Sequence, residues 1–598
     1  MKKNTDESAL KFFFDKKEKG VFLYSGAGRR SSGKNMLFTG AVKHIRCIDK
    51  KRVNGVLDEI DSYLAKGYYF AGYLSYEAGY GTEKKFARIK TGGAPLICGG
   101  IYRGFKEIPH GVVRKTAGPG ERFFSYGFSP SMPRKRYKKA FEKIKKLIKQ
   151  GEAYQVNFCF KINFRWKGLL KDMFFSAAQR QKTPYCAFIN DGERVIMSFS
   201  PELFFRAAGR RIFMKPMKGT VIKENTGGGG GEFLRQSIKN RAENVMIVDL
   251  IRSDLGRICE TNTVKVKELF KVEEYKTVFQ MTSTVAGRLK KEKTFGDIIR
   301  AVYPCGSVTG APKIRAMQII KELEESRRGV YTGAVGFASK SEAVFNIPIR
   351  TPVLKGDKGE MGAGSGIVYD SSADREYEEC LGKTVFFEGA CEGFGVIESF
   401  LYENGKLFLS EFHFDRLKRS LKEFGIRTGI QKVRKVLKKQ TARLDSGKNY
   451  KVRVIVDRNG GISAGAEMIR PVKGGEIAVS EETVDHTDVF LRHKTTVRRL
   501  YDSEYEKYRR QGFADVIFMN EKEEVTEAHS SNIVIRKSGR FYTPPVSCGL
   551  LPGVYRRHLV ETGKCRVKKV FLKDLYEADE IFLCNSVRRM AKVFLQKR

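Results

Sequence analysis

The clearest helical pattern in the chain lies between residues 134 and 150. Tyr137, Phe141, Ile144, Leu147 and Ile148 recur at the spacing of one helix face. Lysine and arginine occupy most of the other positions of this segment. The pattern predicts an amphipathic helix with an apolar stripe on a core and a basic face in water. A helix bound to a membrane surface or to nucleic acid has a similar pattern and is the less favoured interpretation.

Short strand-like runs follow this segment and alternate with helical ones. Residues 194–200, 202–208 and 211–217 are rich in residues that favour strands. Residues 450–461 alternate between apolar and polar side chains and close with an Asn-Gly turn signal. The alternation of helical and strand-like segments predicts a mixed fold of the α+β or α/β class.

The sequence signals for helices and strands are interrupted across residues 384–393, and a new set of them starts at Phe394. We therefore expect one domain over residues 1–388 and a second over residues 389–598. The chain length of 598 residues is also compatible with about three to four smaller domains. The five consecutive glycines Gly227–Gly231 are too few to link domains, and they predict a mobile loop.

The net charge of the chain is strongly positive. Lysine and arginine number 112 and aspartate and glutamate 68, which gives +44. Residues 391–598 carry 41 basic and 27 acidic side chains, and residues 1–390 carry 71 and 41. The charge is spread evenly, whereas a nucleic-acid-binding arm concentrates it. We therefore expect no nucleic-acid partner, and a basic nucleic-acid-binding protein on an inactive scaffold remains an alternative.

The composition also indicates the cellular compartment in which the protein is expected. Hydrophobic residues make up 41% of the chain, which is enough for packed cores, and no run approaches the length of a membrane span. The first twenty residues lack the apolar stretch of a signal peptide. The eleven cysteines are scattered and include no Cys-x-x-Cys pair. We expect a cytoplasmic protein with no membrane partner, no disulfide framework and no zinc site.

Four segments of the first domain contain residue types that are common in active sites. Pro-Glu-Leu-Phe-Phe (201–205) places Glu202 at the mouth of a strand, and Lys218 precedes a Gly-Thr turn. Residues 241–258 predict a helix with Glu243 in its first turn, and residues 362–383 predict a glycine-rich strand followed by a helix with Glu379. Each feature alone is also typical of a surface acid, a turn lysine or a packing glycine.

Taken together and in order, these segments resemble the chorismate-utilising enzymes. The resemblance covers roughly residues 60–385 and implies a chorismate-binding, β-sandwich-like fold with flanking helices. The matching segments are 72–80, 151–158, 201–205, 216–220, 242–258, 305–324, 327–337, 345–351 and 362–383.

Two positions separate the reactions of this family. Members that add water to chorismate have a lysine where this chain has Gln155, so the resemblance disfavours water addition. Anthranilate synthases typically read Pro-Ile-Ala-Gly-Thr where this chain reads Pro-Met-Lys-Gly-Thr (216–220). A lysine at position 218 resembles the large component of aminodeoxychorismate synthases.

The resemblance implies chemical roles for the first domain. Lys218 would be a nucleophile with a depressed pKa, and Glu202 would be the general acid that protonates the leaving ring hydroxyl of chorismate. Ammonia would then replace the lysine on the ring. Glu243 and Glu379 would hold one Mg²⁺ ion against a substrate carboxylate. Other substrate-binding groups would be Tyr331, Arg350, Lys383 and the backbone amides at Gly364 and Gly366.

Two positions depart from the family pattern. The stretch after the Gly-Thr turn, residues 221–233, lacks the usual Arg-Gly-rich sequence and contains the glycine run. Gln280 stands where relatives often have a histidine. The first departure concerns closure of a loop and the second concerns one substrate contact.

The second domain contains another ordered set of segments, at 411–421, 491–499, 512–535, 549–557 and 578–586. The set resembles the class IV pyridoxal phosphate enzymes, the branched-chain aminotransferase-like family, and implies an α+β domain. Lys494 falls at the position of the lysine that bonds the cofactor, and Glu527 falls where a carboxylate keeps the pyridine nitrogen protonated. Arg416, Ser586 and the amides of Val554 and Tyr555 would hold the phosphate.

The two resemblances together imply a bifunctional enzyme of 4-aminobenzoate synthesis for folate. Chorismate would be aminated in the first domain, and pyruvate would be expelled in the second. Motifs alone do not separate lyase from transaminase activity, and an anthranilate synthase fused to an aminotransferase is a further alternative. No glutaminase motif is visible, so ammonia is free or comes from a separate glutamine amidotransferase subunit. The sequence leaves open whether the chain forms a homodimer through the second domain.

Overall fold

The computed structural model of the chain describes residues 2–15, 18–26, 34–89, 92–117, 123–222, 230–274, 278–388, 394–469 and 475–596. The chain divides into two compact units, Met1–Cys391 and Glu392–Arg598. Both units mix helices and strands, which confirms the expected fold class. Among the described helices, none is both long and apolar enough to span a bilayer.

Unit 1 contains two sheets of ten strands each. The first sheet has the order β16-β8-β20-β19-β10-β9-β1-β2-β6, with β7 paired to β8. Its strands are β1 (Gly20–Tyr24), β2 (Met36–Phe38), β6 (Lys106–Glu107), β7 (Phe123–Pro130), β8 (Gln155–Gly168), β9 (Tyr185–Asn190), β10 (Val195–Ser200), β16 (Gly310–Ala311), β19 (Pro352–Lys355) and β20 (Lys358–Ile367).

The second sheet has the order β13-β15-β12-β11-β18-β17-β4-β5-β3, with β14 paired to β15. Its strands are β3 (Lys43–Cys47), β4 (Tyr69–Leu74), β5 (Ile97–Tyr102), β11 (Leu203–Ala208), β12 (Arg211–Met214), β13 (Met217–Ile222), β14 (Lys265–Glu274), β15 (Val278–Arg288), β17 (Ala334–Ala338) and β18 (Glu342–Asn346). The predicted strands at 194–200, 202–208 and 211–217 correspond to β10, β11, β12 and the start of β13.

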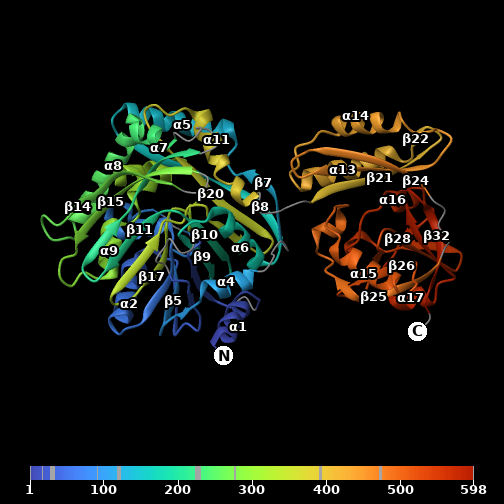
Figure 1. The fold of residues 1–598 in the computed structure, drawn as a ribbon, viewed down its shortest axis with the longest axis horizontal. Helices are drawn as coiled ribbons and strands as arrows, with labels where there is room; N and C mark the ends of the chain where they lie inside the picture. The colour runs from blue at the N-terminus through green and yellow to red at the C-terminus, as the bar shows by residue number, and fades with distance from the viewer. Residues whose placement is uncertain are drawn as a thin grey trace. The chain divides into compact units, whose positions relative to one another are not determined.

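Helices cover the outer faces of both sheets, and an apolar core fills each interface (Figure 1). The helices of unit 1 are α1 (Lys2–Asp15), α2 (Val53–Ala65), α3 (Gly79–Thr82), α4 (His110–Ala117), α5 (Arg134–Lys149), α6 (Leu170–Gln181), α7 (Gly230–Gln236), α8 (Ile238–Gly256), α9 (Phe295–Val302), α10 (Lys313–Leu323), α11 (Ala373–Gly382) and α12 (Val385–Glu388), with short 3-10 turns η2 (Lys50–Arg52), η3 (Tyr76–Ala78), η4 (Lys84–Phe86) and η6 (Gly306–Val308).

Four layers result, and apolar cores fill the interfaces between them. The residues between the two sheets include Val21, Tyr73, Ile196 and Val335. A second core lies between the second sheet and α2, α8 and α9, and a third lies between the first sheet and α1, α4 and α6. The expected β-sandwich-like arrangement with flanking helices is confirmed.

The basic segment that was predicted as a helix is α5, which ends one residue before the predicted boundary. Tyr137, Phe141, Ile144 and Ile148 are buried in a core shared with β8, β20 and α10. The basic face of α5 meets the acidic helix α11, where Arg134 contacts Asp374 at 3.0 Å. The apolar stripe therefore packs on the protein's own sheet.

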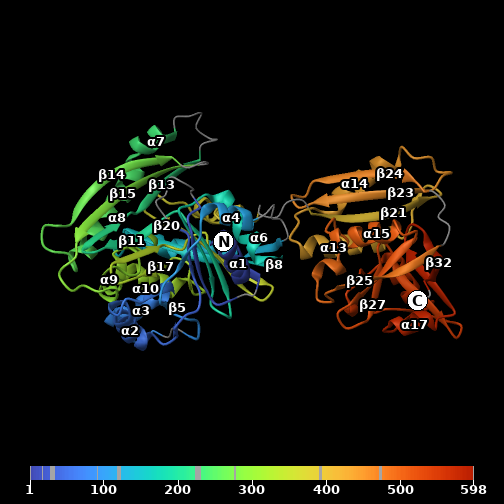
Figure 2. The ribbon, with the colours of Figure 1, turned by 60° about the horizontal axis from the view of Figure 1, so that its bottom comes forward.

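Three local predictions need correction. Helix α8 begins at Ile238 with Ser237 as its N-cap, so Glu243 lies in the second turn of the helix and not in the first. Lys218 lies within strand β13, and the Gly219 after it has φ of 78° in a bulge, where a turn was expected. Of the glycine run, Gly230 and Gly231 open helix α7, and residues 227–229 lie outside the described residues. Figure 2 shows α7 against the strands β13, β14 and β15.

Unit 2 has a four-stranded sheet in the order β22-β21-β23-β24 and an eight-stranded sheet in the order β27-β26-β25-β32-β31-β28-β29-β30. The strands are β21 (Gly395–Glu403), β22 (Lys406–Leu407), β23 (Tyr450–Asp457), β24 (Ile462–Met468), β25 (Glu476–Val484), β26 (Asp515–Asn520), β27 (Val525–Ala528), β28 (Asn532–Lys537), β29 (Arg540–Thr543), β30 (Arg566–Val567), β31 (Glu580–Asn585) and β32 (Arg589–Leu595).

The helices of unit 2 are α13 (Ser410–Glu423), α14 (Ile430–Thr441), α15 (Arg499–Arg509), α16 (Val554–Glu561) and α17 (Leu572–Tyr576), with 3-10 turns η7 (Val489–Arg492) and η8 (Val546–Cys548). The alternating run 450–461 forms β23 and the turn to β24, where Gly460 has φ of 89°. The segment 578–586 contains β31, which is followed by β32.

A buried ion pair stabilises the interior of unit 1. The Arg328 guanidinium contacts the Glu324 carboxylate at 2.7 Å, and both side chains are less than 5% exposed. Arg328 also donates to the Val308 carbonyl at 2.9 Å. Removal of one partner leaves a buried charge without compensation, which is costly.

We expect Arg328→Met to lower the free energy of unfolding of unit 1 by about 3 to 5 kcal/mol. Trp166, the single tryptophan of the chain, lies in β8, so its fluorescence in a denaturant titration follows unit 1. The matched control is Arg315→Met, because Arg315 pairs with Glu152 at the surface and such pairs contribute under about 1 kcal/mol. Equal effects of the two substitutions would contradict the prediction.

Candidate functional sites

Glu202 and Lys218 come from neighbouring parts of the second sheet of unit 1. Glu202 directly precedes β11 and is 4% exposed, and its carboxyl accepts a hydrogen bond from the Ser307 hydroxyl at 2.8 Å. Lys218 lies on β13 opposite Met281 of β15. The charge of Lys218 lowers the pKa of Glu202, and the charge of Glu202 raises the pKa of Lys218. The two predicted catalytic groups therefore share one site.

Burial favours the neutral forms of both groups. Burial raises the pKa of Glu202 to about 7, although Ser307 and Lys218 oppose the shift. Burial also lowers the pKa of Lys218, although Glu243 and Glu202 oppose that shift. Burial thus shifts both groups toward a protonated carboxylic acid and a neutral amine, and a pair in these forms is suited to acid-assisted nucleophilic attack.

Glu243 interacts electrostatically with Lys218 and with two acids of α11. Burial raises the pKa of Glu243 on α8, although the charges of Lys218 and Lys239 lower it. The negative charges of Glu376 and Glu379 on α11 add smaller upward shifts. Such repulsion is relieved by a divalent cation, and carboxylate oxygens are the ligands that Mg²⁺ prefers. Glu243 and Glu379 as metal ligands stay a prediction, and Glu376 is an additional acid near them that the sequence did not indicate.

Lys383 caps helix α11 and links it to the glycine-rich strand β20. Its ammonium group contacts Glu379 at 2.7 Å and donates to the Gly364 carbonyl at 2.8 Å. A Cβ atom at Gly366 would lie 2.1 Å from the side-chain nitrogen of Gln155. Gln155 is 1% exposed, and no partner for its amide atoms is found in the described part of the chain. The glycines of β20 therefore leave room for buried polar side chains.

Tyr331 and Arg350 are both largely buried. The ring of Tyr331 fills the space in which a Cβ atom at Gly362 would lie, at 2.2 Å. Burial lowers the pKa of Arg350, and its guanidinium donates to the neutral amide of Gln181. A partly buried guanidinium that donates to a neutral amide is suited to a carboxylate ligand.

Lys494 of unit 2 is held against strand β21 of the four-stranded sheet. The Ile397 amide donates to the Lys494 carbonyl at 2.7 Å, and Val396 bridges to Thr495. Burial and the charge of Arg416 lower the pKa of Lys494 to about 7, although Glu398 raises it. The amine of Lys494 is therefore substantially neutral at physiological pH.

Glu527 on β27 is buried and receives three hydrogen bonds. The donors are the Tyr501 hydroxyl at 3.2 Å, the Leu551 amide at 3.1 Å and the Asn532 amide group at 3.3 Å. Burial nevertheless raises the pKa of Glu527 to about 7. Tyr501 and Asn532 are site residues that the sequence reasoning missed.

Arg416 on α13 is oriented by a buried acid on β21. The guanidinium of Arg416 donates to both oxygens of Glu398, at 2.9 and 2.7 Å, and to the Pro552 carbonyl at 3.4 Å. His413 contacts the same carboxylate at 2.6 Å. Burial by itself would raise the pKa of Glu398, but Arg416 and His413 lower it to about 2. Glu398 thus fixes the guanidinium next to the loop before α16.

The remaining predicted phosphate ligands lie on α16 and after β31. Helix α16 begins at Val554, so the amides of Val554 and Tyr555 belong to its first turn and have no partner within the helix. The Ser586 hydroxyl donates to the Ser399 carbonyl of β21 at 3.3 Å. A buried lysine, a buried carboxylate, an arginine and free helix amides fit the aldehyde, pyridine and phosphate groups of pyridoxal phosphate.

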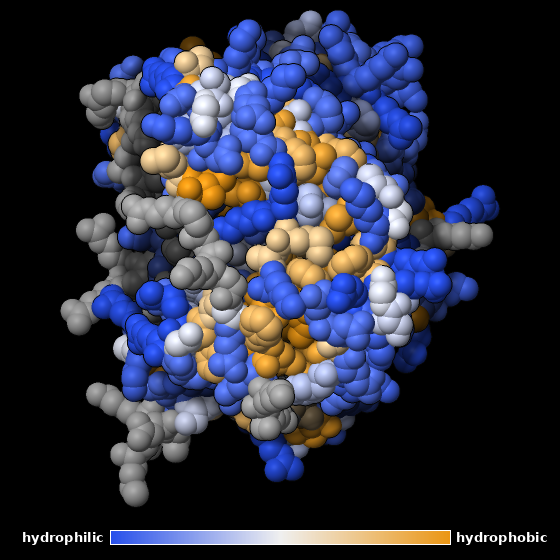
Figure 3. All heavy atoms as spheres, turned by 90° about the vertical axis from the view of Figure 1, so that its right-hand side faces the viewer, coloured by the Kyte–Doolittle hydropathy of each residue, from blue (hydrophilic) through white to orange (hydrophobic). Residues whose placement is uncertain are grey.

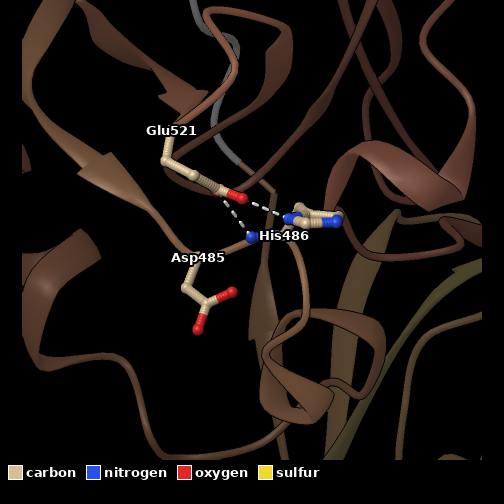
Figure 4. Close-up of side chains that lie close together, drawn as sticks. All are labelled: Asp485, His486 and Glu521. Atoms are coloured by element: carbon tan, nitrogen blue, oxygen red, sulfur yellow. Dashed lines mark hydrogen bonds and ion pairs between the residues drawn. The ribbon is translucent and has the colours of Figure 1, made fainter.

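A third polar cluster, Asp485, His486 and Glu521, lies near the surface of unit 2 (Figure 4). The ring of His486 contacts Glu521 through Nδ1 and Lys522 through Nε2, the latter at 2.9 Å. The Asp485 carboxylate points away from Glu521 in the figure and accepts from Thr487 at 2.8 and 2.6 Å. Both ring nitrogens have protein partners, so the cluster gives no support for a metal site.

Family models match both units. The model of the chorismate binding enzyme family matches residues 19–388, and the model of amino-transferase class IV matches residues 395–594. Aminodeoxychorismate synthase component 1 of Escherichia coli is 36% identical over 257 residues, which are 42% of this chain and 57% of that protein.

Anthranilate synthase component 1 of Methanothermobacter thermautotrophicus is also 36% identical, over 276 residues that are 45% of this chain and 60% of that protein. The chain thus spans a little over half the length of these relatives. The crystal structure of anthranilate synthase component I from Streptococcus pneumoniae TIGR4 matches with a TM-score of 0.50 at 25% identity, over 62% of this chain and 90% of that chain. The chain therefore belongs to the chorismate binding enzyme family through residues 19–388, and a class IV amino-transferase domain follows in residues 395–594.

Proposed function

We propose that the chain is a bifunctional enzyme of 4-aminobenzoate synthesis. Unit 1 would aminate chorismate to aminodeoxychorismate, and unit 2 would act on that product as a lyase. The observation that carries the proposal is the shared site of Lys218 and Glu202, in which burial favours a neutral amine beside a protonated acid. The similarity to aminodeoxychorismate synthase component 1 supports the same assignment.

The first reaction uses Lys218 as a temporary substituent. Its neutral amine attacks the far end of the allylic system of chorismate, the bond from the ring carbon to the hydroxyl breaks, and Glu202 supplies a proton so that water leaves. Ammonia then attacks the vacated carbon, and the bond to Lys218 breaks. The new amine returns one proton to Glu202, which restores the acid for the next cycle.

Charged groups of unit 1 would hold the two carboxylates of the substrate. A Mg²⁺ ion held by Glu243 and Glu379 would neutralise one of them when bound. Arg350, Tyr331, Lys383 and the amides at Gly364 and Gly366 would receive the other. Gln155 supplies no basic nitrogen to activate water, which favours ammonia as the nucleophile. The ammonia would come from a separate glutamine amidotransferase subunit or from solution.

Unit 2 would use pyridoxal phosphate, which supplies an electron sink to the reaction when bound. Glu527 would accept the pyridine N–H, and Arg416, Ser586 and the first turn of α16 would bind the phosphate. Lys494 would move the proton from the ring carbon next to the substrate nitrogen, which allows pyruvate to leave and the ring to become aromatic. Elimination is proposed over transamination because its substrate is the product of unit 1.

The proposal includes a reducing compartment and a dimer. All ten cysteines in the described residues are free and buried, which suits the cytoplasm.

Figure 3 shows apolar residues gathered across one end of unit 2, the side on which α16, β24 and β32 lie in Figure 1. Exposed apolar surface of this kind is typical of association sites, and it supports a homodimer through unit 2.

The product of the reaction tests the function directly. Purified chain supplied with chorismate, an ammonium salt, Mg²⁺ and pyridoxal phosphate should form 4-aminobenzoate and pyruvate in equal amounts, measured by chromatography. Formation of anthranilate would refute the proposal in favour of an anthranilate synthase. Salt-sensitive binding of DNA or RNA without any turnover would support the nucleic-acid alternative.

Two lysine substitutions test the division of labour. Lys218→Ala should reduce amination of chorismate by a factor of about a thousand or more and leave the conversion of supplied aminodeoxychorismate unchanged. Lys494→Ala should make aminodeoxychorismate accumulate with little 4-aminobenzoate. The variants control for each other, and loss of both activities in either folded variant would contradict the assignment.

Glu398 should control cofactor binding without a contact to the reacting atoms. Glu398→Gln removes the charge that orients Arg416, so we expect binding of pyridoxal phosphate to weaken about tenfold or more. The measurement is a fluorescence titration of the cofactor-free chain. The matched control is Glu403→Gln on the same strand, because Glu403 pairs with Arg589 at 2.6 Å at the surface. Equal affinity of the two variants would contradict this role.

A further inference from the structure

The turn between Cys305 and Thr309 contributes a buried hydroxyl to the site of unit 1. The Ser307 hydroxyl donates to Glu202 at 2.8 Å, and both side chains are 4% exposed. We propose that Ser307 is a positioning residue, which fixes the rotation of the Glu202 carboxyl so that its proton faces the leaving hydroxyl of the substrate. The inference rests on the proposed amination reaction and assigns a residue on which that reaction depends.

The turn that carries Ser307 is itself fixed by buried groups. The Thr309 hydroxyl donates to the Cys305 carbonyl at 2.8 Å and closes the turn around η6. The Arg328 guanidinium donates to the Val308 carbonyl at 2.9 Å. Ser307 therefore cannot withdraw from Glu202 unless contacts of a buried ion pair are also lost.

The backbone of Glu202 is equally fixed from the other side. The Glu202 amide donates to the Ser200 hydroxyl at 3.1 Å, and the Ile347 amide donates to the Glu202 carbonyl at 3.1 Å. The freedom that remains to Glu202 is rotation within its side chain. The hydrogen bond from Ser307 to one carboxyl oxygen removes much of that freedom, and the Met217 backbone also hydrogen-bonds to the carboxyl.

The same hydrogen bond tunes the strength of the acid. A hydroxyl that donates to a carboxylate favours the ionised form, so Ser307 lowers the pKa that burial raises. The titratable groups around this carboxyl are Lys218, which also lowers its pKa, and Cys305, whose thiol lies 3.3 Å from the Ser307 hydroxyl. Burial raises the pKa of Cys305 to about 12, so the thiol stays neutral in the working range. Without Ser307, Glu202 would hold its proton too tightly for rapid transfer.

The test is the pH profile of amination in the full chain, with chorismate, an ammonium salt and Mg²⁺. Activity requires protonated Glu202, so its ionisation forms the alkaline limb of kcat/KM. Ser307→Ala removes a bond that lowers the pKa, so the alkaline inflection should move upward by about one pH unit. We expect kcat to fall about tenfold or more with little change in KM, because the proton is transferred in the transition state.

The control is Ser125→Ala, because Ser125 is equally buried and donates to the Phe387 carbonyl away from this site. It should leave the inflection unchanged. Trp166 fluorescence establishes that each variant is folded. If Ser307→Ala is unfolded, Ser307→Cys, with a weaker donor, should give a smaller upward shift. An unchanged inflection in the folded variant would overturn the inference, even if the rate fell. A wild-type chain that does not aminate chorismate would refute the proposed function itself.

Discussion

Removal of ionisable side chains from water shapes both candidate sites, because a buried group favours its neutral form. Burial is the largest influence on Glu202, Lys218, Lys494 and Glu527, and it moves acids and amines in opposite directions. For Glu202 and Lys218, an acid that keeps its proton and an amine that has lost its own are the forms that acid catalysis and nucleophilic attack need. The sheets and helices create this condition by enclosing the groups in packed layers.

Charges that must persist inside the same layers are paired. Arg328 is held by Glu324, and Arg416 is held by Glu398, which also contacts His413. These pairs lie next to the sites and fix the turns and loops that carry reactive or binding groups. Arg328 supports the turn of Ser307, and Glu398 aims Arg416 toward the loop before α16. The neutral reactive groups thus depend on rigid, charged neighbours.

The net charge of +44 explains little about the two candidate sites. Many surface lysines and arginines pair with nearby acids, as Arg134 does with Asp374. The cations that face the proposed ligands are few, among them Arg350, Lys383 and Arg416. The excess positive charge can speed the capture of anionic substrates, but the sites are defined by the small buried set.

The sequence by itself determined the mixed fold class and the ordered segments around Lys218, Glu202, Lys494 and Glu527. Local patterns were sufficient there, because helix and strand periodicity and motif order are properties of neighbouring residues. The helix at 134–149 and the strands near 195–208 were accordingly predicted to within a residue or two. The start of α8 was missed although its N-cap is local, because the Ser237 side chain accepts from the Asn240 amide. The bulge at Gly219 was missed because a register shift depends on the pairing of β13 with β15.

Only the tertiary structure decided which groups accompany the motif residues. Ser307 reaches Glu202 from 105 positions away, and Glu398 meets Arg416 across a strand-to-helix contact. Glu398 interrupts the apolar part of β21, which was a signal that this acid must have a buried partner, but no pattern named that partner. The pKa of each group follows from its burial and its neighbours, and both arise only when distant segments pack together.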